Sequence, residues 1–181
     1  NVKGFSNLDN GLFLEEVIQQ FKNLGYKNIW WKIVCAADYG VPQMRYRMFM
    51  IGNRLGVDFE APPKTNFPIG SGKFPEYTTV GDAIMDLVGK ENHVANHVPL
   101  NHKPIVAARY KYVKEGCKLN LDDLPPELAI ATRRDSKTGK IVNYSHVYKR
   151  LDRNSPSTTM VPGHNAFPIH PTLNRTLTAR E

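Results

Sequence analysis

The stretch DYGVPQMRYRMFMIG, residues 38–52, combines a turn, two arginines and an apolar run. Its glycine and proline indicate a turn, and residues 45–52 have the large apolar and aromatic content typical of a strand. Arg45 and Arg47 stand at the start of that strand. Residues two apart on a strand point to one side, roughly 6.6 Å apart. Two guanidiniums so placed can clamp an anion or the polar edge of a ring. The spacing alone favours a plainer alternative, in which each arginine pairs with a core carboxylate.

A helix and a further strand are predicted just before this stretch. Residues 10–25 carry apolar side chains at helical spacing, with Asp9 or Asn10 available as the N-terminal cap and Gly25 suited to a left-handed end. Residues 28–36, NIWWKIVCA, predict a strand. Helix, strand, turn and strand form one unit, which we expect at the edge of an α/β sheet. The apolar helix positions are Leu12, Phe13, Val17, Phe21 and Leu24.

The chain changes character between residues 53 and 77. Four prolines and little periodicity there predict a long connection and so a domain boundary. Residues 78–89 then predict a short helix, capped by Thr78 or Thr79 and ended by Gly89. Its inward-facing positions would be Ala83, Ile84 and Leu87.

The second half of the chain has weaker patterns. Residues 105–116 predict a helix, and residues 130–148 predict a hairpin with DSKTG at its tip. The final six residues, TLTARE, place Thr178 three positions before Glu181, which is the spacing of a capping box at the start of a helix. Together with the first residue, Asn1, this unfinished pattern leads us to expect that the chain is truncated at both ends.

Basic residues concentrate in one segment. The net charge is +7, and residues 101–153 hold twelve Lys and Arg against six Asp and Glu, whereas the rest of the chain is nearly balanced. This distribution is typical of a surface that binds a polyanion such as nucleic acid. A solvated basic face is the alternative that charge alone leaves open.

The remaining composition excludes several classes of protein. No run of 18 apolar residues exists, so the sequence predicts no membrane-spanning helix. Cys35 and Cys117 have neither metal-ligand spacing nor a disulfide framework, which fits a reducing, cytoplasmic compartment. His93, His97 and His102 lie close together, but prolines interrupt the segment and no cysteine accompanies them. We therefore expect no metal site.

Four stretches, in this order along the chain, resemble the motifs of the DNA (cytosine-5) methyltransferases. NVKGF at residues 1–5 is similar to the continuation of the family's Glu-Asn-Val motif, and GVPQMRYR at 40–47 resembles its Gly-Val-Pro-Gln-x-Arg-x-Arg motif. RLDRNSPSTTM at 150–160 and IHPTLNRTLTARE at 169–181 resemble the late motifs. The order and the length of these matches make the resemblance specific, and it spans essentially the whole chain.

The resemblance implies an enzyme that transfers a methyl group from S-adenosylmethionine to carbon 5 of a cytosine flipped out of a specific site in double-stranded DNA. The family's glycine-rich cofactor loop and Pro-Cys nucleophile have no counterpart here, since neither Cys35 nor Cys117 follows a proline. The activating glutamate would precede Asn1. We therefore expect the isolated chain to be inactive, to bind no cofactor, and to need a missing N-terminal catalytic part as its partner.

The resemblance also assigns roles to individual residues. It implies that Arg45 and Arg47 help to hold the flipped base, its phosphates and the closed catalytic loop, and that Gln43 supports this geometry. It implies structural roles for Asn1, Val2, Arg175, Arg180 and Glu181, the last three orienting the DNA-recognition domain. Basic and polar residues of that domain would contact DNA, although a solvated surface position is the alternative for each. These candidates are Arg109, Lys111, Arg133, Arg134, Lys137, Lys140, Asn143, Arg150, Arg153, Ser157, Thr158 and Thr159.

The predicted fold is α/β (α+β overall), with four segments. Residues 1–53 would be the C-terminal part of a catalytic methyltransferase domain, namely the edge of a Rossmann-like sheet formed by a helix and an antiparallel strand pair. Residues 54–76 would be a linker, and residues 77–165 a smaller, mixed and irregular target recognition domain. Residues 166–181 would return to the catalytic domain and stop before its last helix.

Three functional readings follow from the sequence. In the first, the chain is an excised part of a bacterial, cytoplasmic DNA methyltransferase of the kind found in restriction-modification systems. In the second, it is a natural subunit of a split methyltransferase. In the third, it is a stand-alone, sequence-specific DNA-binding module. The sequence does not reveal the recognised DNA site.

Overall fold

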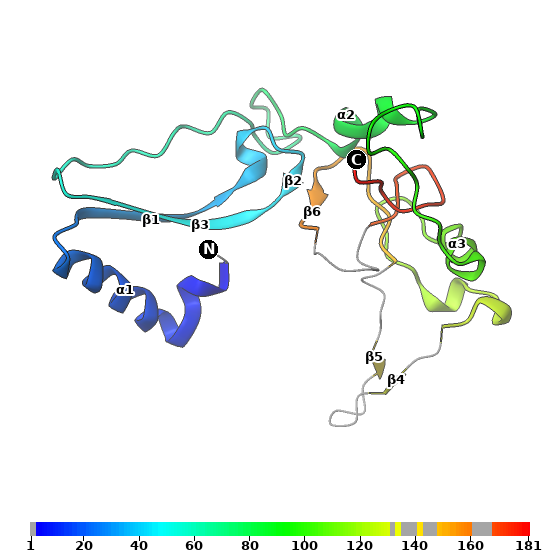
Figure 1. The fold of residues 1–181 in the computed structure, drawn as a ribbon, viewed down its shortest axis with the longest axis horizontal. Helices are drawn as coiled ribbons and strands as arrows, with labels where there is room; N and C mark the ends of the chain where they lie inside the picture. Colours follow the sequence, from blue (N-terminus) through cyan, green and yellow to red (C-terminus); the bar gives the residue numbers. More distant parts are fainter. Residues whose placement is uncertain (1–2, 131–132, 135–140, 143–147, 161–167) are drawn as a thin grey trace. The chain divides into compact units, whose positions relative to one another are not determined.

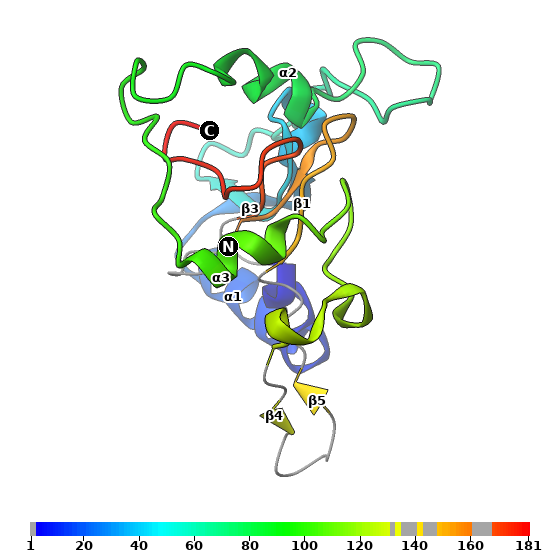
Figure 2. The ribbon, with the colours of Figure 1, turned by 90° about the vertical axis from the view of Figure 1, so that its right-hand side faces the viewer.

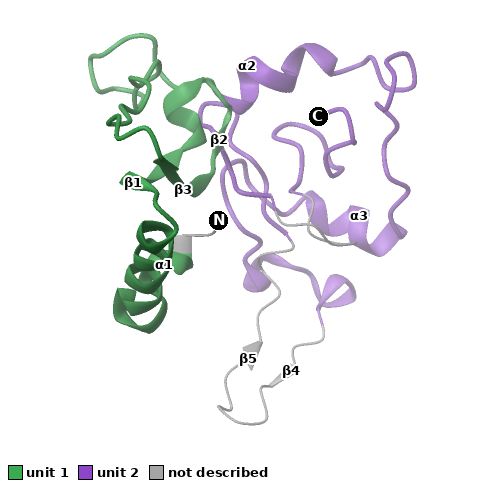
Figure 3. Cartoon of the chain, turned by 60° about the vertical axis from the view of Figure 1, so that its left-hand side comes forward, with its two compact units in different colours: residues 1–78 green, residues 79–181 purple. Residues whose placement is uncertain are grey.

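The computed structural model divides the chain into two compact units, residues 1–78 and residues 79–181 (Figure 3). Both units combine short helices with short strands (Figure 1), so the mixed α/β class is as predicted. Within the described ranges, no helix is long and apolar enough to cross a bilayer. The structure describes residues 3–130, 133–134, 141–142, 148–160 and 168–181.

The first unit is built on a helix and an antiparallel strand pair. β1 and β3 pair with Trp30 opposite Ile51 and Cys35 opposite Tyr46, and the register is irregular between Lys27 and Trp30. This confirms the predicted order of helix, strand, turn and strand. The elements are η1 (Lys3–Gly11), α1 (Leu12–Asn23), β1 (Lys27–Cys35), η2 (Ala36–Tyr39), β2 (Gln43–Met44) and β3 (Tyr46–Asn53).

The start and the packing of α1 differ from the prediction. Gly11, with a φ of 92°, is the N-terminal cap, and no side chain caps the helix. Asp9 and Asn10 have left-handed φ values of 48° and 53° inside the preceding turn, so the predicted cap residues are wrong. The end of the helix is as predicted, since Gly25 has a φ of 85°.

The apolar stripe predicted for α1 is largely exposed. Leu14, which lies outside that stripe, is the buried residue of the helix, and Val17 is half-buried. The aromatic side chains of the stripe contact only single neighbours, Phe13 against Phe5 and Phe21 against Tyr26. The exposed members of the stripe are Leu12, Phe13, Phe21 and Leu24.

Residues 54–78 complete the first unit without a further helix or strand. An isolated bridge joins Phe67 to Glu76 and closes a loop. Phe59 packs edge-on against Trp30 of β1 at 4.9 Å between ring centroids. An apolar cavity of about 320 Å³ lies between the β1–β3 pair and the segment around Phe59. The predicted linker is therefore in contact with the strand pair.

The second unit begins with a capped helix. Thr79 accepts a hydrogen bond from the Asp82 amide while the Asp82 carboxylate accepts from the Thr79 amide, which confirms Thr79 as the cap. A Cβ on Gly81 would lie 2.7 Å from the carbonyl oxygen of Arg153, and the Gly81 amide donates to that oxygen at 2.8 Å. Only glycine permits this close backbone approach.

Two clusters of buried side chains form the core of this unit. Tyr110, Val113, Leu119, Tyr148 and Ile169 make the larger cluster. Val80, Ile84, Leu151 and Leu177 make the smaller one. The predicted inward positions Ile84 and Leu87 are buried, but Ala83 is exposed and Val80 takes its place. The short helix places residue 80, not 83, against the residues around Leu151.

The other elements of the second unit are short. The predicted helix over 105–116 ends earlier, at Tyr110, although Gly116 does adopt a left-handed φ of 73°. The predicted hairpin is confirmed by β4 and β5, which pair with Arg133 opposite Val142 (Figures 1 and 2); its tip lies outside the described residues. The elements are α2 (Val80–Ile84), η3 (Met85–Leu87), α3 (Pro104–Tyr110), η4 (Leu121–Asp123), η5 (Pro126–Leu128), β4 (Arg133–Arg134), β5 (Ile141–Val142) and β6 (Ser157–Thr158).

Candidate functional site

The segment that follows β1 forms a closed loop. The Ala36 amide donates to the Arg45 carbonyl at 2.9 Å and continues the β1–β3 ladder by one step. Inside the loop, Gly40 has a φ of 83°, which strains any residue with a Cβ. The Gln43 amide donates to Val41 and the Arg45 amide to Gln43. These bonds close the loop at Ala36 and Arg45 and set the backbone of its Val41–Arg45 part.

The two arginines of the opening stretch occupy different positions. Arg47 lies in β3, opposite Val34, whereas Arg45 lies in the loop just before the strand. The predicted same-side arrangement requires one continuous strand, and the strand is interrupted at Arg45, between β2 and β3. Both side chains are half-buried. Arg45 Nη1 lies 3.5 Å from Gln43 Oε1, and Arg47 Nη1 donates to the Tyr46 carbonyl at 2.8 Å.

The alternative of two core ion pairs is not what the structure shows. Among the described residues, no carboxylate lies within 4.0 Å of either guanidinium. Most of the N–H groups of Arg45 and Arg47 therefore have no partner among the described residues. Half-buried guanidiniums with open donors suit a planar or anionic ligand.

A buried carboxylate anchors the same loop. Asp38 is 6% exposed and accepts a hydrogen bond from the Tyr77 hydroxyl at 2.5 Å and an ion-pair contact from Lys64 Nζ at 2.9 Å. Hydrogen bonding to Asp38 raises the pKa of Lys64. Burial, with the Asp38 hydrogen bond, raises the pKa of Tyr77, so its phenol stays protonated and donates. Sequence reasoning missed Asp38, because nothing in DYG distinguishes a buried carboxylate from a turn aspartate.

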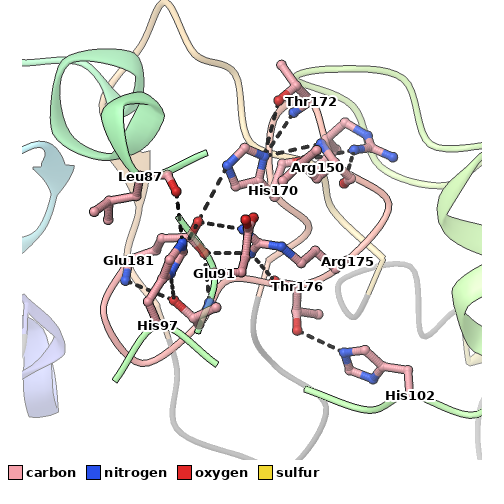
Figure 4. A network of polar contacts seen from close by, with 12 residues as sticks. Leu87, Glu91, His97, His102, Arg150, His170, Thr172, Arg175, Thr176 and Glu181 are labelled. Atoms are coloured by element: carbon pink, nitrogen blue, oxygen red, sulfur yellow. Dashed lines mark hydrogen bonds and ion pairs between the residues drawn. The ribbon is translucent and has the colours of Figure 1, made fainter. Parts of the chain in front are cut away.

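In the second unit, the end of the chain forms a buried charge network (Figure 4). Glu181 takes two hydrogen bonds from Arg175, at 2.7 and 2.8 Å, and Arg175 also donates to Glu91 at 2.9 Å. Burial opposes ionisation of Glu181, but the hydrogen bonds from Arg175 and from the Thr178 amide outweigh it and lower the pKa of Glu181. The Thr178 and Glu181 amides and side chains also exchange hydrogen bonds, so the predicted capping-box pairing is present.

Two fully buried histidines line this network. His97 bonds the Leu87 carbonyl through Nε2 and the Thr178 hydroxyl through Nδ1. Since a carbonyl only accepts, Nε2 carries a proton. His170 Nδ1 accepts from the Thr172 and Leu173 amides, each at 3.2 Å. Its Nε2 faces Glu181 at 3.6 Å without a hydrogen bond to any described residue.

Burial lowers the pKa of His170 to about 4, against the opposing pull of Glu181. The ring is therefore neutral near pH 7. The amide bonds to Nδ1 place its proton on Nε2, which points toward the carboxylate. Two further hydrogen bonds hold the C-terminal segment beside residues 96–102 (Figure 2). The Arg180 amide donates to the Asn96 carbonyl, and His102 bonds the Thr176 hydroxyl.

Three of the arginines predicted to contact DNA make side-chain hydrogen bonds within the protein. Arg150 is 5% exposed, and all five of its N–H groups donate to four carbonyls and the Asn174 side chain at 2.6–2.7 Å. Arg109 donates to the Leu128 and Ala129 carbonyls and to the Tyr148 hydroxyl. Arg153 forms a two-point pair with Glu115 at 2.8 Å. Arg150 is thus a structural residue, and its prediction as a DNA contact is corrected.

The other predicted contacts have mixed settings. Lys111, Thr158, Thr159 and Arg180 are exposed, and Ser157 is buried at 7% exposure. Arg133 and Arg134 are described only as backbone partners in the β4–β5 pair. Outside the described residues lie Asn1, Val2, Lys137, Lys140 and Asn143.

Two lysines that sequence reasoning missed lie opposite each other. Lys118 and Lys149 are partners in an antiparallel bridge, and among the described residues neither pairs with a carboxylate. Like charges on directly opposite residues repel, so this arrangement favours an anionic partner. The pairing joins positions 31 residues apart, which no local pattern reveals. No group of three or more His, Cys, Asp or Glu in the described part of the chain could hold a metal.

The chain is similar in sequence to known proteins. The family model for C-5 cytosine-specific DNA methylases matches residues 1–181. The Type II methyltransferase M1.HphI of Haemophilus parahaemolyticus is 31% identical over all of this chain and 44% of its own length. The Type II methyltransferase M.NgoFVII of Neisseria gonorrhoeae is 30% identical over all of this chain and 46% of its own length.

A solved structure supports the fold. A protein described as a DNA modification methyltransferase encoded within an E. coli prophage matches 94% of this chain and 54% of its own, with a TM-score of 0.52 and 20% identity. The chain therefore spans about half the length of the proteins it matches. With a family model that covers every residue and two relatives at 30% identity or above, the chain belongs to the C-5 cytosine-specific DNA methylase family.

Proposed function

We propose that this chain supplies DNA recognition and base gripping to a DNA (cytosine-5) methyltransferase, which transfers a methyl group from S-adenosylmethionine to carbon 5 of a flipped cytosine. The observation that carries the proposal is that Arg45, at the end of the closed loop beside Gln43, and Arg47, in the adjoining strand β3, have no carboxylate partner among the described residues. Family membership makes flipped cytosine and its phosphates the natural ligand of that loop.

The chemistry of the loop fits this role. A flipped cytosine offers a carbonyl oxygen and ring edge, and its backbone offers phosphate oxygens; guanidinium N–H groups bind both kinds of acceptor. Half-burial of the arginines excludes part of the competing water and strengthens such bonds. Gln43 Oε1 lies 3.5 Å from Arg45 Nη1, which orients that guanidinium.

The chain does not supply the residues that bind the methyl donor or attack the base. Cys35 is buried and follows Val34, and Cys117 follows Gly116, so neither offers the family's Pro-Cys nucleophile. The glycine-rich cofactor loop is also absent from the 181 residues. We assign no residue of this chain to S-adenosylmethionine, and the nucleophile must come from another part of the enzyme.

We assign the segments as the sequence suggested. Residues 1–53 belong to the catalytic domain, residues 54–76 connect, residues 77–165 recognise DNA, and residues 166–181 return toward the catalytic domain. In the recognition segment, exposed lysines would contact phosphates and position the duplex without reading its sequence. We add Lys118, which is exposed, and Lys149, which is half-buried, to Lys111 as candidates, and we leave out Arg150, which is buried.

The test uses the complete gene product in cells. Bisulfite sequencing of DNA from cells that carry the intact gene should reveal one methylated cytosine context. Purified Arg45→Ala and Arg47→Ala enzymes should then lose about 100-fold or more in kcat/KM on a duplex with that site, because groups that hold the reacting base act in the transition state.

Arg54→Ala is the matched control. Arg54 lies in the same unit, is exposed, and stacks on Tyr26 at 4.8 Å instead of facing the loop. Its loss should change kcat/KM less than about twofold. Unmethylated DNA from cells with the intact gene, or wild-type rates for both loop variants, would contradict the proposal.

A further inference from the structure

Asp38 is a buried charged group that the proposed function does not yet use. Its carboxylate accepts from the Tyr77 hydroxyl at 2.5 Å and pairs with Lys64 at 2.9 Å. Its backbone carbonyl accepts from the amides of Thr65 and Asn66 at 2.9 and 3.0 Å. Asp38 therefore contacts four residues of a segment that lies 26 to 39 positions away.

These contacts join two loops of the first unit. Asp38 lies in η2, within the loop that Ala36 and Arg45 close, and its partners lie on the segment around the Phe67–Glu76 bridge. A Cβ on Gly40 would approach the Asn66 side chain at 3.3 Å, so the loop and the segment pack closely on this side as well. The ladder closes the loop at Ala36 and Arg45, and Asp38 ties its η2 turn to the later segment.

The Tyr77 bond is the stronger of the two side-chain contacts. Lys64 is 58% exposed, so water screens its attraction to the carboxylate. The Tyr77 hydroxyl is half-buried, and a hydrogen bond to an ionised acceptor is about twice as strong as a neutral one. A buried carboxylate without these partners would be costly, which keeps the two loops together.

We propose that Asp38 is a positioning residue, which uses Tyr77 and Lys64 to hold the loop that carries Gln43 and Arg45 and leads into Arg47 of β3, the three residues proposed to meet the flipped base. The inference rests on the proposed function. Tyr77 also lies two residues before Thr79, the cap of α2, so the same contact fixes the peptide that leads into the second unit. Asp38 itself touches no substrate; it acts through the arginine loop.

The test compares four changes in the complete gene product. Tyr77→Phe removes the hydroxyl and little else, and Lys64→Met removes the ammonium. Asp38→Asn removes the charge but keeps an acceptor, whereas Asp38→Ala removes both. Asp58→Asn is the control, because Asp58 is an exposed carboxylate in the same unit. KM is measured on a duplex containing the mapped site, and base flipping is followed on the same duplex with 2-aminopurine in place of the target cytosine.

Tyr77→Phe should raise KM for DNA about tenfold and reduce the fluorescence of the flipped 2-aminopurine, while the thermal unfolding midpoint changes by only a few degrees. Asp38→Asn should retain more activity than Asp38→Ala, because its amide oxygen still accepts from Tyr77. Lys64→Met should have a smaller effect than Tyr77→Phe, and Asp58→Asn should behave as wild type.

A purely stabilising role predicts a different pattern. In that case Tyr77→Phe would lower the unfolding midpoint but leave KM and the 2-aminopurine signal of the folded enzyme unchanged, and the inference would be overturned. Should Asp38→Ala fail to fold, Tyr77→Phe still decides. Full activity of Arg45→Ala in the same assay would refute the proposed function, whereas an inactive Arg45→Ala beside a wild-type Tyr77→Phe would refute only the role of Asp38.

Discussion

The arginines of the two units differ in what their guanidiniums bond. In the second unit, all five guanidinium N–H groups of Arg150 donate hydrogen bonds within the protein, and Arg175 donates to the carboxylates of Glu91 and Glu181. In the first unit, Arg45 and Arg47 each make one hydrogen bond within the described residues. Arg150 and Arg175 of the second unit are therefore bonded within the protein, whereas most guanidinium donors of Arg45 and Arg47 have no partner among the described residues.

This difference can be tested as a difference between stability and activity. Each substitution that follows removes a charged or titratable side chain from one of the two units. If arginines of the second unit are structural, their loss should lower the free energy of unfolding. If arginines of the first unit serve a ligand, their loss should lower activity and leave that free energy nearly unchanged.

The largest effect is expected for Arg150→Met. The change leaves the carbonyls of Tyr110, Val113, His170 and Leu173 without their donor in a buried site, and unpaired buried acceptors cost about 1–3 kcal/mol each where they cannot relax. We expect the free energy of unfolding in urea to fall by roughly 3–5 kcal/mol.

Arg47→Met is the matched change in the first unit. It removes a half-buried guanidinium with one described hydrogen bond, so the expected loss is below about 1 kcal/mol. Equal losses for the two variants would contradict the comparison, because they would make Arg47 as structural as Arg150.

An intermediate effect is expected on acidification, through His170. Its folded pKa of about 4 lies below the ordinary value near 6.5, so the unfolded chain binds a proton first as the pH falls. The stability that depends on neutral His170 is complete above pH 6.5, declines between pH 6.5 and 4, and amounts to up to about 3 kcal/mol. Protonation at Nδ1 would also displace the Thr172 and Leu173 amide bonds.

The measurement is the urea midpoint between pH 7.5 and 4.5 for wild type and His170→Gln. The wild-type curve should fall more steeply than that of the variant, whereas His93→Gln, a change at an exposed histidine, should follow wild type. If the urea midpoints of all three proteins fell in parallel with pH, His170 would not be a cause of the loss of stability in acid.

The sequence predicted the local elements of both units better than their long-range contacts. The strands around residues 28–52, the Thr79 cap and the Thr178–Glu181 pairing follow from side chains within a few positions of each other. The cap of α1 was wrong because Asp9 and Asn10 adopt left-handed backbone, which their residue types also permit.

The candidate site shows the same limit. Motif spacing found Gln43, Arg45 and Arg47, but Asp38 acquires its role only through Tyr77, 39 positions away. Arg150 was indistinguishable from a surface arginine, because the carbonyls that surround it come from positions 110, 113, 170 and 173. The charge distribution therefore predicted the basic segment, but it did not distinguish arginines bonded within the protein from lysines without a carboxylate partner among the described residues.

A smaller effect is expected for the two opposed lysines of the second unit, of which Lys118 is exposed and Lys149 half-buried. Each Lys–phosphate contact releases about 0.9 counterion, so Lys118→Ser with Lys149→Ser should reduce the slope of log K against log salt by about 2 on a mixed-sequence duplex. Lys22→Ser with Lys27→Ser is the control, since it removes the same charge from exposed positions of the first unit. Equal slopes for the two double variants would show that net charge, not the opposed lysines, sets the salt dependence.

The smallest effect separates an exposed ion pair from the buried arginines of the same unit. Arg153 pairs with Glu115 at 2.8 Å, and its hydrogen bonds lower the pKa of Glu115 to about 2, yet the Arg153 side chain is 45% exposed. Water and salt screen such a pair, so Arg153→Ala should cost less than about 1 kcal/mol of unfolding free energy, and less still in 1 M NaCl. A loss as large as that of Arg150→Met would mean that bond geometry, not burial, decides which arginines stabilise this unit. A small, salt-sensitive loss would place burial first, because both guanidiniums make short hydrogen bonds and only Arg150 makes them out of reach of water.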